Sequence, residues 1–130
     1  MSFLRKLFGR EDREEEIVEA APVKLDVEGR RRQLQRLEQA LDALATEMRA
    51  EQSMDNPGWR ARVNEYSRLA GDAADQRRAP TREGMLDLVF EIRPVFSGQV
   101  PAGMEPLVPL QAEVLAAAEA LRELLPGEKA

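Results

Sequence analysis

The sequence predicts an all-α protein, an antiparallel bundle of three to four helices with a flexible N-terminal tail. Three observations lead to this fold class. Apolar residues recur at alternating spacings of three and four along most of the chain after residue 26. Asn-Pro and Pro-Thr pairs interrupt this pattern where new helices would begin. Charged residues make up 33% of the chain, which favours long solvated helices over a compact sheet.

The first helix is expected to begin at Asp26, whose carboxylate can accept hydrogen bonds from the free N–H groups of the first turn. Five large apolar residues then form a stripe: Leu34, Leu37, Leu41, Leu44 and Met48. Two heptads are too short to demand a free-standing coiled coil. The stripe is therefore interpreted as one face of a bundle core.

Asn56-Pro57 predicts the start of a second helix, with Asn as the N-cap and Pro in the first helical position. The short connection before it makes the first two helices an antiparallel hairpin. Trp59 is interpreted as a core or hairpin-clasp residue. The rest of the buried stripe consists of Val63, Tyr66, Leu69, Ala70 and Ala73.

Residues 82–93 fit two patterns. Leu86, Leu88, Phe90 and Ile92 alternate along the chain as in a strand. A helix places a different set on one side: Met85, Leu88, Val89 and Ile92. The helix is favoured because no other segment offers a convincing partner strand, and a lone strand leaves its backbone unpaired.

A last helix is expected from about Pro106 to Leu125, ended by Pro126-Gly127. Its stripe contains Leu107, Leu110, Val114, Ala117, Leu121 and Leu124. Further apolar residues widen that stripe: Val108, Leu115, Ala118 and Leu125. This width predicts that the last helix is the most buried and the central one.

Residues 1–10 form an apolar and basic leader, residues 11–25 an acidic linker, and residues 26–126 the helical bundle domain. The leader would place its apolar side chains on one side of a helix, which is typical of a peripheral membrane anchor. Its expected contacts with an anionic membrane surface are Phe3, Leu4, Arg5, Lys6, Leu7 and Phe8. The apolar gain and the ordering cost nearly cancel, so attachment would be weak and reversible. The alternative is a leader that folds back onto the bundle or stays disordered.

Composition excludes much chemistry. The chain has no Cys and no His, so disulfides, thiolate catalysis and Cys/His zinc sites are absent. It contains no P-loop, no dinucleotide-binding glycine motif and no G-x-S-x-G motif. Glu83, Asp87 and Glu91 could approach a hard cation, but a solvated helix face is the favoured interpretation. The prediction is a protein that is not an enzyme and has no cofactor.

Four arginines at the start of the first helix are candidate anion contacts: Arg30, Arg31, Arg32 and Arg36. They could hold phosphates, or they could pair with the acidic linker just upstream. Binding to nucleic acid is not expected, because the net charge is −5 and no aromatic residues lie nearby for base stacking.

Leu86 and Phe90 form a second candidate site. On a helix they lie one turn apart and away from the predicted core side, ringed by charged residues. Two apolar groups with a charged rim are typical of a small partner surface, although burial within one chain is the alternative.

These observations favour a helical interaction or adaptor protein that binds a protein partner or itself and is held transiently at the inner face of the membrane. The alternative is a small homo-oligomeric structural protein with no membrane role. The leader is similar to the short Phe/Leu/Lys starts of various bacterial proteins, and the expected location is the cytoplasm.

Overall fold

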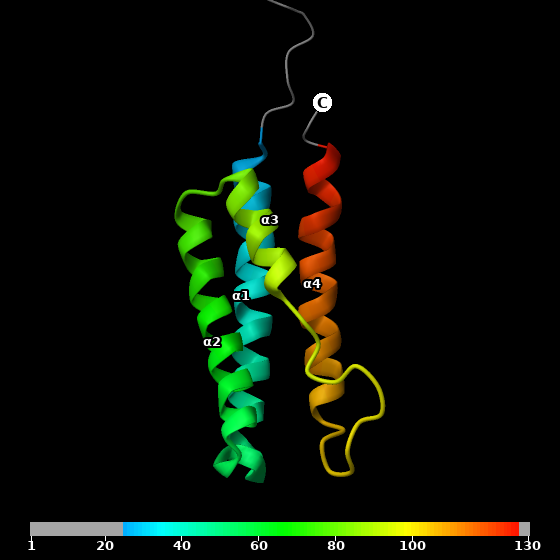
Figure 1. The fold of residues 1–130 in the computed structure, drawn as a ribbon. Helices are drawn as coiled ribbons and strands as arrows, with labels where there is room; N and C mark the ends of the chain where they lie inside the picture. The colour runs from blue at the N-terminus through cyan, green and yellow to red at the C-terminus, as the bar shows by residue number, and fades with distance from the viewer. Residues whose placement is uncertain (1–24, 128–130) are drawn as a thin grey trace, which may run out of the picture.

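Four α-helices and one short 3-10 helix make up the part of the chain that the structure, a computed structural model, describes: residues 25–127 (Figure 1). In chain order they are α1 (Val27–Ala50), η1 (Gln52–Asp55), α2 (Pro57–Arg78), α3 (Arg82–Glu91) and α4 (Leu107–Gly127). These residues contain no strand, and α1 packs against both α2 and α4. The predicted all-α bundle is confirmed. The leader and nearly all of the linker, residues 1–24, lie outside the described residues.

The predicted N-caps Asp26 and Asn56 are confirmed, and Thr81 of the Pro-Thr pair caps α3. The Asp26 carboxylate accepts a hydrogen bond from the Gly29 N–H at 3.0 Å. Asn56 Oδ1 accepts from the N–H of Gly58 at 2.8 Å, and Thr81 Oγ1 from the N–H of Gly84 at 3.1 Å. Each side chain satisfies a backbone donor that the first turn of a helix leaves without a partner.

The predicted antiparallel hairpin of α1 and α2 is also confirmed (Figure 1). The stripe of α1 from Leu34 to Met48 is buried, and it meets Val63, Tyr66 and Leu69 of α2 in one core. Trp59 packs against this core, and its indole Nε1 donates to the Met48 carbonyl oxygen at 3.0 Å. Trp59 therefore joins the two helices next to their connection, as a clasp.

The ambiguous segment is a helix, α3, and the strand interpretation was wrong. Met85, Leu88 and Val89 are buried, while Ile92 follows the last turn and is partly buried. The helix has only ten residues. It lies between α2 and α4 and contacts both.

The central helix is α1 and not α4, so the prediction for the last helix was wrong. α1 contacts both α2 and α4, and its buried positions recur from Arg30 to Met48. α4 contacts α1 and α3, and it leaves Val108 41% and Leu115 36% exposed. The cause is the shortness of α3, which cannot cover the flank of a helix of 21 residues.

Residues 92–106 connect α3 to α4 without regular secondary structure. Gly103 has a φ of 91°, a backbone conformation that a side chain disfavours. Gln111 of α4 holds this segment, because its side-chain oxygen accepts from the Phe96 N–H at 2.9 Å. α4 then continues to Gly127, two residues beyond the predicted end.

Candidate partner-binding face

The largest exposed apolar side chain among the described residues belongs to α3. Phe90 is 67% exposed, and Leu86, one turn earlier on the same side of the helix, is half-buried. On the other side of α3, Glu91 forms an ion pair with Arg68 of α2 at 2.8 Å. Leu86 and Phe90 therefore lie away from the side of α3 that pairs with α2.

α4 contributes apolar residues from its facing side. Gln111 marks this side, because it bonds to the backbone of Phe96 in the segment that leaves α3. Val108 lies three residues before Gln111 and Leu115 four residues after it, so all three share one side of α4. Glu113, on the opposite side, pairs with Arg36 of α1 at 2.8 Å.

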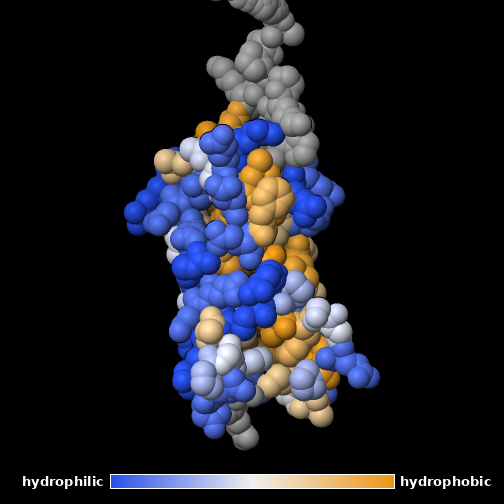
Figure 2. All heavy atoms as spheres, in the orientation of Figure 1, coloured by the Kyte–Doolittle hydropathy of each residue, from blue (hydrophilic) through white to orange (hydrophobic). Residues whose placement is uncertain are grey.

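We name Leu86, Phe90, Val108 and Leu115 the α3–α4 face. Figure 2 shows a vertical band of hydrophobic residues along the seam between the two helices, next to a mostly hydrophilic surface over α2. Exposed charges flank the face on both helices: Arg82, Glu83, Asp87, Glu119 and Arg122. The carboxylates of Glu83 and Asp87 have no ion-pair partner among residues 25–127.

The two residues predicted as a partner surface do share this face, but they differ in exposure. Phe90 projects into solvent, whereas Leu86 packs against the core and only its outer part is accessible. The apolar stripe predicts Val108 and Leu115 in the core, but both are exposed and belong to the face instead. One feature of the sequence could have indicated that Val108 and Leu115 are exposed. The last helix is about twice as long as α3, the helix available to cover it.

The four candidate anion contacts do not form a single cluster. Arg30 is buried at 1% exposure, and its Nη1 donates to the Leu121 carbonyl oxygen at 3.0 Å and to Gln33 at 2.8 Å. Burial lowers the pKa of Arg30, and the nearby Asp26 carboxylate opposes that shift. Arg30 thus joins α1 to α4 and is not accessible to an external phosphate.

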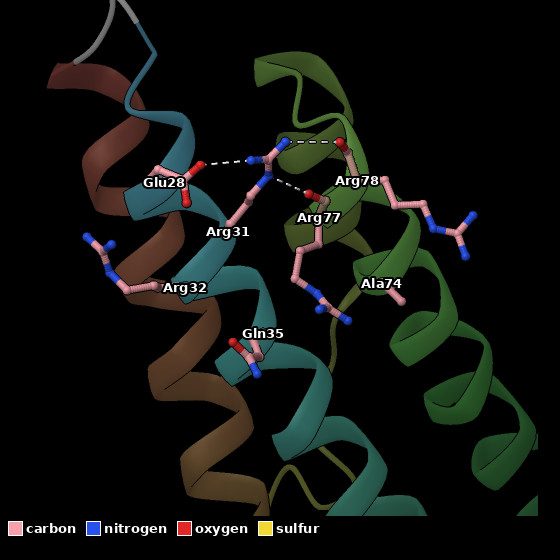
Figure 3. Close-up of a pocket in the computed structure, with 7 residues that line it drawn as sticks. All are labelled: Glu28, Arg31, Arg32, Gln35, Ala74, Arg77 and Arg78. Atoms are coloured by element: carbon pink, nitrogen blue, oxygen red, sulfur yellow. Dashed lines mark hydrogen bonds and ion pairs between the residues drawn. The ribbon is translucent and has the colours of Figure 1, made fainter.

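Arg31 joins α1 to the end of α2 (Figure 3). Its guanidinium donates to the carbonyl oxygens of Arg77 and Arg78 at 3.0 and 3.3 Å, and to the Glu28 carboxylate at 2.8 Å. The two carbonyls belong to the last turn of α2, where backbone acceptors lack helical partners. Arg31 therefore acts as a cap for α2 that comes from another helix.

A shallow pocket of about 470 Å³ surrounds this contact. Seven residues line it, four of them arginines: Glu28, Arg31, Arg32, Gln35, Ala74, Arg77 and Arg78. Arg77 is engaged by Glu38 at 2.6 Å, and Figure 3 shows Arg32 and Arg78 pointing away from each other. Arg31 and Arg77 are thus already used to hold α1 and α2 together.

The other two candidate anion contacts, Arg36 and Arg32, differ in whether an ion pair already engages them. Arg36 pairs with Glu113 of α4 through two hydrogen bonds of 2.8 and 3.1 Å, and the hydrogen bond lowers the pKa of Glu113. Arg32 is exposed and makes no ion pair with the described residues. Of the four candidates, Arg32 alone keeps its charge fully available for an anion. Pairing with the acidic linker falls outside the described residues, as do all six leader residues from Phe3 to Phe8.

A polar network that the sequence did not predict anchors the chain as it leaves α3. The buried Tyr66 hydroxyl donates to the Arg93 carbonyl oxygen and accepts a hydrogen bond from Arg62 at 2.8 Å. Arg62 also donates to the Pro94 carbonyl oxygen at 2.7 Å. Burial raises the pKa of Tyr66. This network fixes the end of α3 against α2 and so sets the position of Phe90.

Within residues 25–127, acidic side chains do not gather in a group that could hold a metal ion. None of the helices in this range combines the length and apolar character that crossing a membrane requires.

Comparisons with protein-family models, with curated proteins and with solved structures find no match to this chain. The fold and the α3–α4 face are therefore the basis for assigning a function.

Proposed function

We propose that this chain is a non-enzymatic helical interaction protein of the cytoplasm that binds a protein partner through the α3–α4 face. The exposure of Phe90 carries the proposal. A phenylalanine held 67% exposed on a packed helix loses the free energy of burial, about 1–2 kcal/mol, unless a partner covers it. Its neighbours Leu115 and Val108 extend the apolar surface, and the charges around them supply a polar rim.

The network beneath α3 supports this assignment. Tyr66 and Arg62 hold the backbone directly after α3, so Phe90 is presented from a fixed helix. A rigid aromatic anchor binds a partner with a small cost in side-chain entropy.

Replacing Phe90 tests the face. Phe90→Ser is expected to abolish recovery of a specific partner from cells of the source organism while leaving the melting temperature nearly unchanged. Asn64→Ser on the exposed side of α2 is the matched control and should keep the partner. Affinity purification with mass spectrometry measures recovery. The same recovery with Phe90→Ser and with Asn64→Ser would refute the face, and a complex that contains only this chain would favour the homo-oligomeric alternative.

We further propose that the leader attaches the protein transiently to the anionic inner face of the membrane through its apolar and basic side chains. The double change Phe3→Ser with Phe8→Ser is expected to lower sedimentation with phosphatidylglycerol-containing vesicles, and salt should weaken binding of the unchanged protein. Ser53→Ala with Ser97→Ala, outside the leader, is the control. Equal sedimentation of all three proteins would refute the anchor.

A further inference from the structure

The exposed apolar part of the α3–α4 face is small for a stable dimer of two copies of the bundle. Its strongly exposed apolar residues are Phe90, Val108 and Leu115. A stable dimer buries on the order of 800 Å² on each partner, several times the area of three side chains. A short apolar segment fits a face of this size better than a second copy of the bundle does.

We propose that the leader of the same chain, residues 3–8, docks on the α3–α4 face when no partner is bound. The inference rests on the proposed face and adds its occupant in the free protein. The leader brings four apolar side chains of the kind that would cover Phe90: Phe3, Leu4, Leu7 and Phe8. Docking would shield from water the apolar surfaces of the leader and of the face together.

The tether is long enough and starts at the correct end. Figure 1 shows the start of α1, the start of α3 and the end of α4 at the same end of the bundle. Phe90 lies eight residues along α3 from Arg82, about 12 Å at 1.5 Å per residue. Residues 9–24 can span about 50 Å when extended, at roughly 3.3 Å per residue. The leader can therefore reach the face from Leu25 without strain.

Charges follow a complementary order along this path. Counting from the end of the bundle where α1 starts, the α3 side of the face presents Arg82, then Glu83 and Asp87, and then Phe90. The chain leading back from Leu25 contains Lys24, then the acidic run of residues 11–19, and then the basic and apolar leader. The acidic run would pass Arg82, and the bases Arg5 and Lys6 would reach the carboxylates of Glu83 and Asp87, which have no ion-pair partner among the described residues.

Tethering makes a weak contact effective. A short linker gives an effective concentration on the order of 1 mM, so a leader that binds as a free peptide with a Kd of ~100 µM would be docked about 90% of the time. The leader cannot contact the face and a membrane at once. A partner on the face would therefore release the leader for the membrane, and the membrane would expose the face to the partner.

Paramagnetic relaxation in the full chain tests the docking. The chain has no cysteine, so Ser2→Cys places a nitroxide label at one position only. The amide signals of Phe90, Val108 and Leu115 are expected to lose intensity, whereas that of Asn64 on the outer side of α2 should keep it. Phe90→Ser in the labelled chain should restore the lost signals, and so should Phe3→Ser with Phe8→Ser. Uniform broadening, or broadening that these changes leave unaltered, would overturn the proposal.

Two further measurements separate this proposal from the earlier ones. Mixing labelled chain with isotope-enriched unlabelled chain should cause no broadening, and broadening there would overturn docking within one chain in favour of a second copy. Phe90→Ser should also increase affinity for anionic vesicles, by up to about tenfold if the leader is ~90% docked. An unchanged vesicle affinity in a chain that does bind vesicles would overturn the competition. Neither measurement uses partner recovery. The face can therefore fail as a partner site while the docking is supported, or the docking can fail while the partner site is supported.

Discussion

Leu41→Ala is expected to lower the free energy of unfolding by about 2–5 kcal/mol. Leu41 is fully buried in the middle of α1, the helix that contacts both α2 and α4. Truncation removes its apolar contacts and leaves a cavity that neighbouring helices on two sides would have to fill. Chemical denaturation followed by circular dichroism measures the loss.

The matched control is the same substitution on α4. Leu115→Ala should cost about 1 kcal/mol or less, because Leu115 is 36% exposed and truncation there leaves no closed cavity. Arg122→Ala on the same helix should be nearly neutral, since its ion pair with Glu119 is 3.7 Å long and exposed. A Leu115→Ala cost equal to that of Leu41→Ala would mean that α4 is central after all.

The sequence predicted the helices well because their starts are determined locally. Asp26, Asn56 and Thr81 each satisfy a backbone N–H within three residues, so no distant contact is needed to recognise them. The helix predicted within residues 82–93 is confirmed over Arg82–Glu91, and the missing partner strand is the reason the sequence favours it.

The arrangement of the helices was harder to predict because it depends on contacts between distant residues. The apolar stripe of α4 is wider than that of α1, yet α1 is central, since the short α3 leaves one flank of α4 uncovered. Spacing along a helix shows which side is apolar but not which neighbour is long enough to cover it.

The arginines show the same limit. Arg30 and Arg31 bond to backbone carbonyl oxygens of α4 and α2, at separations of 91 and 46 residues along the chain. Backbone acceptors are present at every residue, so nothing in the sequence marks the ones that a distant arginine will find. The prediction that Leu86 and Phe90 share one side of α3 agrees with the structure, because two residues one turn apart share a side by helical geometry alone.

Tyr66→Ala is expected to cost about 3–5 kcal/mol, as for other fully buried aromatic residues. The change removes the ring from the core and the hydroxyl from the network that holds the end of α3. Part of the loss should therefore appear as fraying of α3, visible as faster amide exchange at Val89 than at Leu41. A uniform loss of amide protection across the whole domain would show that the network does not position α3 separately.

Tyr66→Phe isolates the hydroxyl and is expected to cost about 1–2 kcal/mol, because the Arg93 carbonyl oxygen and Arg62 each lose a partner.

The variant should also change how stability responds to alkaline pH. Burial raises the pKa of Tyr66 in the folded state above its usual 10.0. Below that usual value the phenol is neutral in both states, so its contribution to stability is fully present. As pH rises above it, the unfolded chain loses the proton first and stability falls. Tyr66 is the one tyrosine of the chain, so phenolate absorbance follows this group alone. Denaturation of the unchanged protein and of Tyr66→Phe across this pH range should show a steeper fall in the free energy of unfolding for the unchanged protein. Parallel curves of that free energy against pH would mean that the hydroxyl is as accessible to water in the folded state as in the unfolded one.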